Sequence, residues 1–216
     1  MLKINKISLA LGLNLCVLAS GSGSNLKAII KAGKSGIIRS KVVLVVSNNS
    51  ASKALTAAKQ NKIPAYHLSQ KLFSPQTEFD KKFLSLLKKY KIDLIILAGY
   101  LKIINPAITK KYKNRILNIH PALLPEFGGK GMYGINVHEA VLKSRKELTG
   151  ATVHLVDEVY DNGLVILQKE VKVKPGDTPE LLQKRVLRSE HKLYPEAIKL
   201  FESGKVLIKG NKVIFK

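Results

Sequence analysis

Short, almost wholly apolar runs alternate with amphipathic helical patterns through the first half of the chain, and this alternation constrains the fold more than any other feature. Each run is too apolar to leave one face in water, so the runs predict strands of a parallel sheet covered by helices on both faces. We therefore expect an α/β fold. The expected strands are 13–19, 42–46, 65–68, 93–98 and 115–119, with helices following the turn at 21–24 and at 52–62, 77–90 and 106–112.

After Pro121 the pattern changes. A glycine-rich loop at 126–134 precedes a short helix at 137–142. Two alternating segments, 150–156 and 164–173, predict long antiparallel strands around a turn at Asp161-Asn162-Gly163.

The end of the chain predicts one long helix and a hairpin. Thr178 is the expected N-cap of the helix, and residues 205–215 predict a hairpin that turns at Gly210-Asn211. The apolar face expected for the helix carries Leu181, Leu182, Val186, Leu193 and Ile198. With no repeat, low-complexity segment or linker, we expect a single domain over residues 1–216, with halves at about 1–120 and 121–216.

The formal net charge of +22 rests on lysine far more than on arginine. A nucleic-acid-binding protein is expected to use arginine forks and to gather its basic residues on one face. Here the lysines are spread along the chain, and one group lies on the expected solvent side of a helix: Lys81, Lys82, Lys88, Lys89 and Lys91. The charge therefore predicts a solvated surface that attracts anionic ligands, with no specific nucleic acid as partner.

The amino terminus and the single cysteine bear on the compartment. Residues 1–20 resemble a short signal peptide, with Lys3 and Lys6 before an apolar stretch, but Asn14 interrupts that stretch. We prefer a buried first strand, and no run is long enough for a membrane span. The lone Cys16 excludes an internal disulfide framework and indicates a cytoplasmic location.

Three groups of residues could carry chemistry. The first is the segment Ser20-Gly21-Ser22-Gly23-Ser24-Asn25, between a strand and a helix. Glycines allow close approach to an anion, and a helix N-terminus offers free N–H groups. The segment lacks the lysine of a Walker A loop and the spacing of a dinucleotide loop. It predicts a phosphate cradle, with a plain strand-to-helix turn as the alternative.

The second group is Asn118 and His120, at the end of an expected strand. Side chains two residues apart on a strand point the same way, so an amide and an imidazole would enter one cleft. The amide could donate to an oxyanion, and the imidazole could move a proton.

The third group is Asp161, which near His120 would raise the pKa of the imidazole and fix its tautomer. The alternatives are a packing role for His120 and a plain hairpin turn at Asp161. His154 is either part of this group or a core histidine, and the remaining histidines lack metal-ligand spacing.

Together these segments resemble the folate-dependent phosphoribosylglycinamide formyltransferase family over about residues 13–198. The stretches that carry the resemblance are 19–26, Leu97-Ala98-Gly99-Tyr100, 117–125 and 161–168. The resemblance implies a Rossmann-like formyltransferase fold with a phosphate-binding first half, and a folate-side second half that ends in the helix and hairpin. It implies transfer of a formyl group from 10-formyltetrahydrofolate to the amine of phosphoribosylglycinamide in purine (IMP) biosynthesis, without a metal.

The resemblance also implies roles for individual residues. The implied catalytic residues are Asn118, His120 and Asp161. The implied substrate-binding residues are Gly23, Ser24, Asn25, Leu187, Arg188, Ser189 and Glu190. The implied folate-binding residues are Leu101, Lys102, Ile103, Ile104, Asn118, Asp157, Glu158, Val159, Tyr160 and Asp161.

In the implied mechanism, Asn118 and protonated His120 donate to the oxyanion of a tetrahedral intermediate, and Asp161 keeps His120 cationic or oriented. The chain departs from the family at three positions. Lys102 stands where many relatives carry Arg, Leu187 where some are polar, and Gln76 where some place an Arg near the folate. We have no account of residues 1–12, and we expect a monomer or homodimer.

Two other folate enzymes share the amide, imidazole and carboxylate: methionyl-tRNA formyltransferase and formyltetrahydrofolate deformylase. The positive charge favours the first, but the loop at 20–25 suits a small phosphate ester. We expect neither the carboxy-terminal RNA-binding domain of the first nor the amino-terminal regulatory domain of the second. A basic nucleic-acid-binding protein is the non-enzymatic alternative, although aromatic residues are not interleaved with the lysines.

Overall fold

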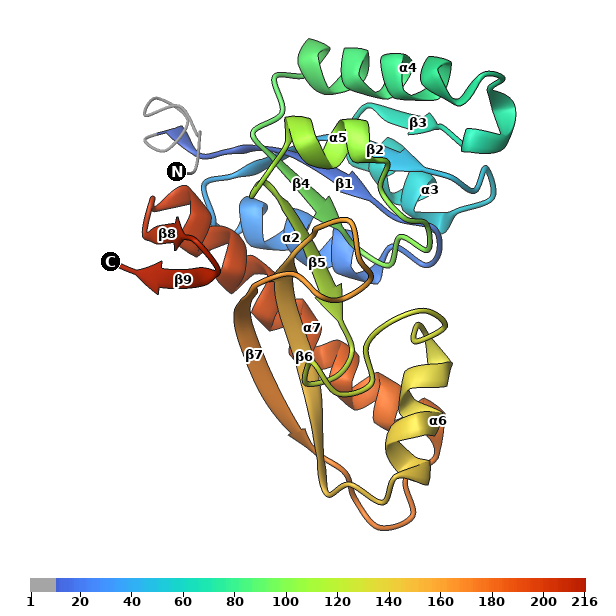
Figure 1. Ribbon diagram of the computed structural model, residues 1–216, viewed down its shortest axis with the longest axis vertical. Coiled ribbons are helices and arrows are strands. Elements are labelled where there is room, and N and C mark those ends of the chain that lie inside the picture. Colours follow the sequence, from blue (N-terminus) through green and yellow to red (C-terminus); the bar gives the residue numbers. More distant parts are fainter. Residues whose placement is uncertain (1–10) are drawn as a thin grey trace.

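A computed structural model describes residues 11–216 of the chain (Figure 1). Its centre is a seven-stranded sheet in the order β3-β2-β1-β4-β5-β6-β7. The strands are β1 (Asn14–Leu18), β2 (Lys41–Ser47), β3 (Ala65–His67), β4 (Leu94–Leu97), β5 (Ile116–His120), β6 (Leu148–Leu155) and β7 (Val165–Lys172). The first five are parallel, β6 is antiparallel to β5, and β7 is antiparallel to β6. This mixed sheet confirms the expected α/β fold class.

Helices cover both faces of the sheet, and β1 shows why its sequence is apolar throughout. Leu15 and Val17 enter one core, whereas Cys16 and Leu18 enter the core on the opposite face. The first core is shared with α2 (Ser24–Lys34), α3 (Lys53–Gln60), α6 (Ile135–Lys143) and α7 (Pro179–Glu202). The second is shared with α4 (Gln76–Lys89) and α5 (Pro106–Lys111), which lie above the sheet in Figure 1.

The ends of the helices follow their local sequence. The Ser52 side chain accepts a bond from the Ala54 N–H at the start of α3, and Thr178 accepts one from Leu181 N–H at the start of α7, as predicted. The expectation that Leu181 lies on the buried face of α7 is wrong, because its side chain is 48% exposed. It precedes the buried Leu182 by one residue, and one residue rotates a helix by about 100°.

The second half has the predicted antiparallel strands, but their connection is longer than a hairpin turn. Residues 156–164 form a loop between β6 and β7, and Asp161 within it has a left-handed backbone (φ 52°). A Cβ on Gly163 would lie 1.8 Å from the Leu155 carbonyl oxygen, so the loop requires glycine there. A short 3-10 helix, η1 (Gln70–Leu72), precedes α4.

The predicted carboxy-terminal hairpin is confirmed. Strands β8 (Val206–Lys209) and β9 (Lys212–Phe215) pair around Gly210-Asn211. Within residues 11–216, no helix combines the length and apolar character that crossing a membrane requires. The preference for a buried first strand over a signal peptide is confirmed by β1. Of residues 1–12, for which we have no account, residues 1–10 lie outside the described part of the chain.

Helix α7 is tied to the rest of the fold by buried polar groups. The Tyr194 hydroxyl, fully buried, lies 2.8 and 3.0 Å from the carbonyl oxygens of Leu97 and Leu117 and can donate to either. At the end of the helix, Glu202 accepts bonds from the backbone N–H groups of Arg39 and Ser40 and from the Ser40 hydroxyl, at 2.7–3.1 Å. One carboxylate therefore joins the last turn of α7 to the segment that enters β2.

Replacing Glu202 by Ala should lower the free energy of unfolding by about 2–3 kcal/mol, because three donors lose their acceptor in a buried site. Urea denaturation measures the change. Glu196→Ala, at an exposed position of the same helix, is the matched control and should change stability by less than about 0.5 kcal/mol. Equal effects of the two substitutions would contradict the proposed anchoring role of Glu202.

Candidate active site

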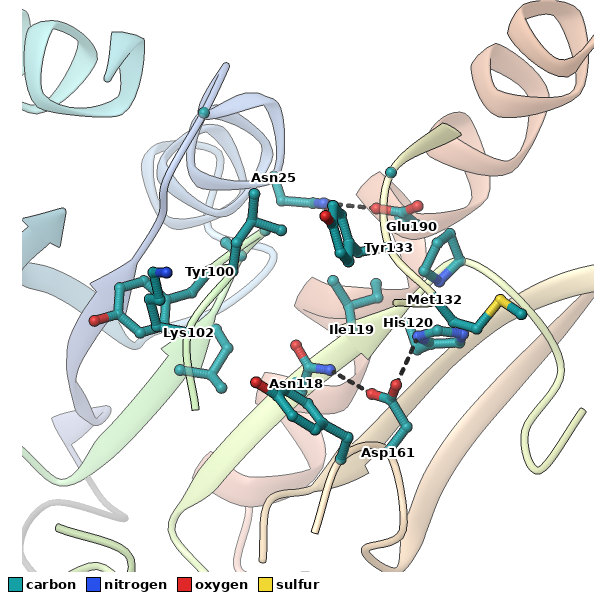
Figure 2. A pocket seen from close by; sticks show the side chains of 18 of the residues that line it. Asn25, Tyr100, Lys102, Asn118, Ile119, His120, Met132, Tyr133, Asp161 and Glu190 are labelled. Carbon is teal, nitrogen blue, oxygen red and sulfur yellow. Dashed lines mark hydrogen bonds and ion pairs between the residues drawn. The ribbon is translucent and has the colours of Figure 1, made fainter. Parts of the chain in front are cut away.

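A cavity of about 630 Å³ opens at the carboxyl ends of β1, β4 and β5 (Figure 2). In a parallel sheet this edge is where ligands bind. The cavity wall combines the glycine loop before α2, the segment after β4, the end of β5, the loop between β5 and α6, the loop between β6 and β7, and one face of α7. The three predicted groups of residues therefore meet in one cavity.

The glycine loop has the features of an anion site. Gly23 is the N-cap of α2 with a left-handed backbone (φ 70°), and a Cβ there would lie 2.8 Å from the Ala54 Cα. No side chain caps the helix, and its first turn holds no acidic residue. The first N–H groups of α2 therefore remain available to an anion. Gly21 to Asn25 all line the cavity.

Strand β5 places Asn118 and His120 on the same side, as predicted. Their partners across the antiparallel ladder are His154 and Thr152 of β6. The Asn118 Nδ2 lies 3.0 Å from His154 Nε2, and His120 is 3% exposed. His154 is thus a fourth polar member of the site, a possibility that the sequence left open.

The Asp161 carboxylate lies between these side chains, as the dashed lines of Figure 2 show for Asn118 and His120. Its Oδ1 lies 3.3 Å from Asn118 Nδ2 and 3.5 Å from His154 Nε2. Its Oδ2 lies 3.5 Å from His120 Nδ1 and accepts a bond from the Gly129 N–H at 3.0 Å. The prediction that Asp161 would approach His120 is confirmed, and a plain hairpin turn is excluded.

The neighbours of the two rings determine which nitrogens carry protons. His154 Nδ1 lies 2.8 Å from the Leu155 carbonyl, which only accepts, so Nδ1 carries a proton. In the neutral ring Nε2 then accepts from the Asn118 amide, and the second amide hydrogen faces Asp161. His120 Nε2 likewise donates to the Phe127 carbonyl at 2.8 Å.

Burial changes the expected acid–base behaviour of the site. It lowers the pKa of His120, and the charge of Asp161 offsets only part of this effect. The expected direction of the Asp161 effect on the pKa of His120 is thus confirmed, but burial outweighs it. Of the two alternatives for Asp161, a cationic ring or an oriented ring, the net pKa shift favours the oriented ring. Burial alone would raise the pKa of Asp161, but contacts with His154, His120 and the Gly129 N–H together lower it, so Asp161 stays ionised.

The predicted folate segment, Leu101 to Ile104, lines the cavity, and the side chains of Leu101 and Ile103 are 51% and 43% exposed. Four of the five residues of the 157–161 loop also line it, whereas the exposed Glu158 does not. Gln76 is the first residue of α4 and lies outside the cavity wall.

Helix α7 contributes one stripe of side chains. Gln183, Leu187 and Glu190 line the cavity, whereas Arg188 and Ser189 do not. Glu190 Oε2 accepts a bond from Asn25 Nδ2 at 2.6 Å, closing the cavity between the first and last long helices (Figure 2). Burial raises the pKa of Glu190, and the bond from Asn25 offsets part of that shift.

Sequence reasoning did not select several residues of the cavity wall. These are Lys130, Met132, Tyr133, His138 and Gln183. The glycine-rich loop was recognised only as a loop. His138 was set aside because it lacks metal-ligand spacing, yet it is 1% exposed and its Nδ1 has no partner among the described residues. Gln183 could have been found from its spacing, because residues 183, 187 and 190 lie on the same face of one helix.

The chain is similar in sequence and in fold to known formyltransferases. The Formyl transferase family matches residues 13–198. A chloroplastic phosphoribosylglycinamide formyltransferase of Arabidopsis thaliana is 44% identical over 185 residues, which is 85% of this chain. The match spans only 63% of the length of that relative. The phosphoribosylglycinamide formyltransferase of Haemophilus influenzae is 38% identical over 197 residues, 91% of each protein. The crystal structure of glycinamide ribonucleotide transformylase 1 from Symbiobacterium toebii has a TM-score of 0.87 at 37% identity, covering 94% and 93% of the two chains.

The buried His138 predicts a pH dependence of stability. Burial lowers its pKa from 6.5 to about 4, so between these values the unfolded chain binds a proton that the folded chain excludes. The free energy of unfolding should therefore fall as the pH drops from 7 to 5, by about 2 kcal/mol for this group. Urea denaturation at both pH values should show a smaller fall for His138→Gln. His67→Gln, at an exposed position, should behave as the wild type; an unchanged fall in His138→Gln would contradict the argument.

Proposed function

The chain belongs to the formyl transferase family, and on this premise we propose that it is a phosphoribosylglycinamide formyltransferase. It would transfer the formyl group of 10-formyltetrahydrofolate to the amine of N1-(5-phospho-D-ribosyl)glycinamide, a step of purine biosynthesis. One observation carries the proposal: a single cavity holds an anion-binding helix N-terminus and, beside it, the cluster of Asn118, His120 and Asp161.

The phosphate of the substrate would bind at Gly23, Ser24 and Asn25, where free N–H groups and the helix dipole favour an anion. The bond between Asn25 and Glu190 places a carboxyl group next to this site. Glu190 would then contact the glycinamide part of the same molecule. Roles for Leu187, Arg188 and Ser189 stay predictions from the resemblance, and of the three only Leu187 lines the cavity.

The folate would bind between the Leu101–Ile104 segment and the 157–161 loop. Both offer backbone polar groups with exposed apolar side chains beside them, among them Leu101, Val159 and Tyr160. This combination suits a flat heterocycle with several donors and acceptors. Lys102 supplies a positive charge for an anionic cofactor, without the fork that Arg would offer.

In the proposed mechanism, the substrate amine attacks the formyl carbon and forms a tetrahedral intermediate with a negative oxygen. The Asn118 amide would donate to this oxygen by exchanging its longer bond, the 3.3 Å contact with Asp161. A carbon–nitrogen bond to the substrate forms, the bond to N10 of the folate breaks, and one proton passes from the amine to N10. His120, neutral in the empty site, would accept that proton and pass it on, with the ionised Asp161 stabilising the transient imidazolium.

The proposal takes small molecules as the only ligands, in a protein that is a monomer or homodimer in the cytoplasm. The reaction as written needs no metal, because proton transfer and oxyanion stabilisation come from side chains. The buried, unpaired Cys16 is compatible with a reducing compartment.

The decisive test mixes the purified protein with glycinamide ribonucleotide and 10-formyltetrahydrofolate and measures release of tetrahydrofolate. We expect turnover that requires the amine. Release without the amine would identify a deformylase, and formylation of methionyl-tRNA would identify the tRNA enzyme. Salt-dependent binding of random RNA, without turnover in any arm, would overturn the proposal.

The catalytic roles predict that Asn118→Ala lowers kcat by about a hundredfold or more, since one lost oxyanion donor costs ~3 kcal/mol. His120→Ala should have an effect of at least the same order. His67→Ala, outside the cavity wall, is the control and should keep the wild-type rate. Circular dichroism checks that the variants are folded; normal turnover of both cavity variants would make the mechanism wrong.

A further inference from the structure

Ser20 lies where three parallel strands end, and all of its polar groups are bonded to other segments. Its backbone N–H donates to the Gly99 carbonyl after β4, and its carbonyl accepts from the Asn49 side chain after β2. Its hydroxyl donates to Asn48 Oδ1 at 2.6 Å and accepts from the Leu101 N–H at 3.0 Å. The residue is 7% exposed. Ser20 therefore joins the segments that follow β1, β2 and β4.

Two of these segments belong to different ligand sites. Ser20 is the first residue of the glycine loop (residues 20–25), and Gly21 to Asn25 of this loop line the cavity. Leu101 is the first residue of the proposed folate segment, and its side chain is half exposed in the cavity. The Ser20 hydroxyl accepts a hydrogen bond from the Leu101 N–H. The position of the folate segment thus depends on the hydroxyl of the first residue of the phosphate loop.

We propose that Ser20 is a positioning residue that couples the phosphate loop to the folate segment, so that each substrate binds to a wall that the other helps to order. The inference rests on the proposed function. A hydroxyl that both donates and accepts can serve two loops at once, whereas alanine leaves the Leu101 N–H and Asn48 Oδ1 without partners. Leu101 and Asn48 are both accessible to water, which can replace the two bonds lost with the Ser20 hydroxyl. Loss of the hydroxyl should therefore weaken substrate binding more than it lowers the stability of the fold.

Ser52 offers a matched control because it holds the same loop without reaching the folate segment. Its hydroxyl donates to the Gly21 carbonyl at 3.0 Å and accepts from the Ala54 N–H at 3.2 Å. Ser20→Ala and Ser52→Ala therefore each remove one buried hydroxyl next to the glycine loop. Only the first removes the bond to Leu101.

The experiment measures KM for both substrates, with kcat, in Ser20→Ala, Ser52→Ala and the wild type. Ser20→Ala should raise KM for 10-formyltetrahydrofolate and for glycinamide ribonucleotide by about 3- to 10-fold each, the effect of one hydrogen bond, with kcat nearly unchanged. Ser52→Ala should raise only KM for the ribonucleotide. Amide hydrogen exchange at Leu101 should accelerate in Ser20→Ala and not in Ser52→Ala.

Unchanged KM values in Ser20→Ala would overturn the inference, as would an equal rise of the folate KM in both variants, because that rise would report general loosening. If Ser20→Ala fails to fold, Asn48→Ala replaces it: loss of the acceptor that orients the hydroxyl should raise the folate KM by about 2-fold and speed exchange at Leu101. No effect of that variant would overturn the inference too. Absence of turnover in the wild type would instead overturn the proposed function, and this inference with it.

Discussion

The contact on which the site depends is the one between the Asp161 carboxylate and the side chains around it. Two of its neighbours are histidine rings and one is an amide, and all three come from strands β5 and β6. A charge in so closed a place needs hydrogen-bond donors, and the Asn118 amide and the Gly129 N–H both donate to it. Asp161 is therefore both the electrostatic centre of the cluster and the reason that Asn118 points its amide hydrogens inward.

The reversal of strand direction after β5 makes this contact possible. If β6 ran parallel to β5, the chain would have to cross over between the two strands, and β6 would end at the same edge of the sheet as β5. Because β6 is antiparallel, it runs back past Asn118 and His120 and places His154 opposite Asn118. The loop after β6, held against the Leu155 carbonyl at Gly163, then returns Asp161 to the same cavity.

Much of the fold and part of the site could be predicted from the sequence, because both rest on local rules. Apolar runs identified the strands of the parallel half, the turn at Gly210-Asn211 identified the last hairpin, and a spacing of two placed Asn118 and His120 on one side. The misses depend on packing. The net direction of the His120 pKa shift depends on how deeply the ring is buried. The exposure of Leu181 depends on where α7 meets the sheet. No local pattern carries that information.

The bond between Asn25 and Glu190 joins an element near the start of the chain to one near its end. Asn118, His120 and Asp161 all precede α7 in the sequence, so a ribosome has already made the reactive groups before it makes the wall that encloses them. Until α7 has been made, the cavity lacks the wall that Gln183, Leu187 and Glu190 supply. Enclosure of the two ligands is thus a property that the protein acquires only after α7 has been synthesised.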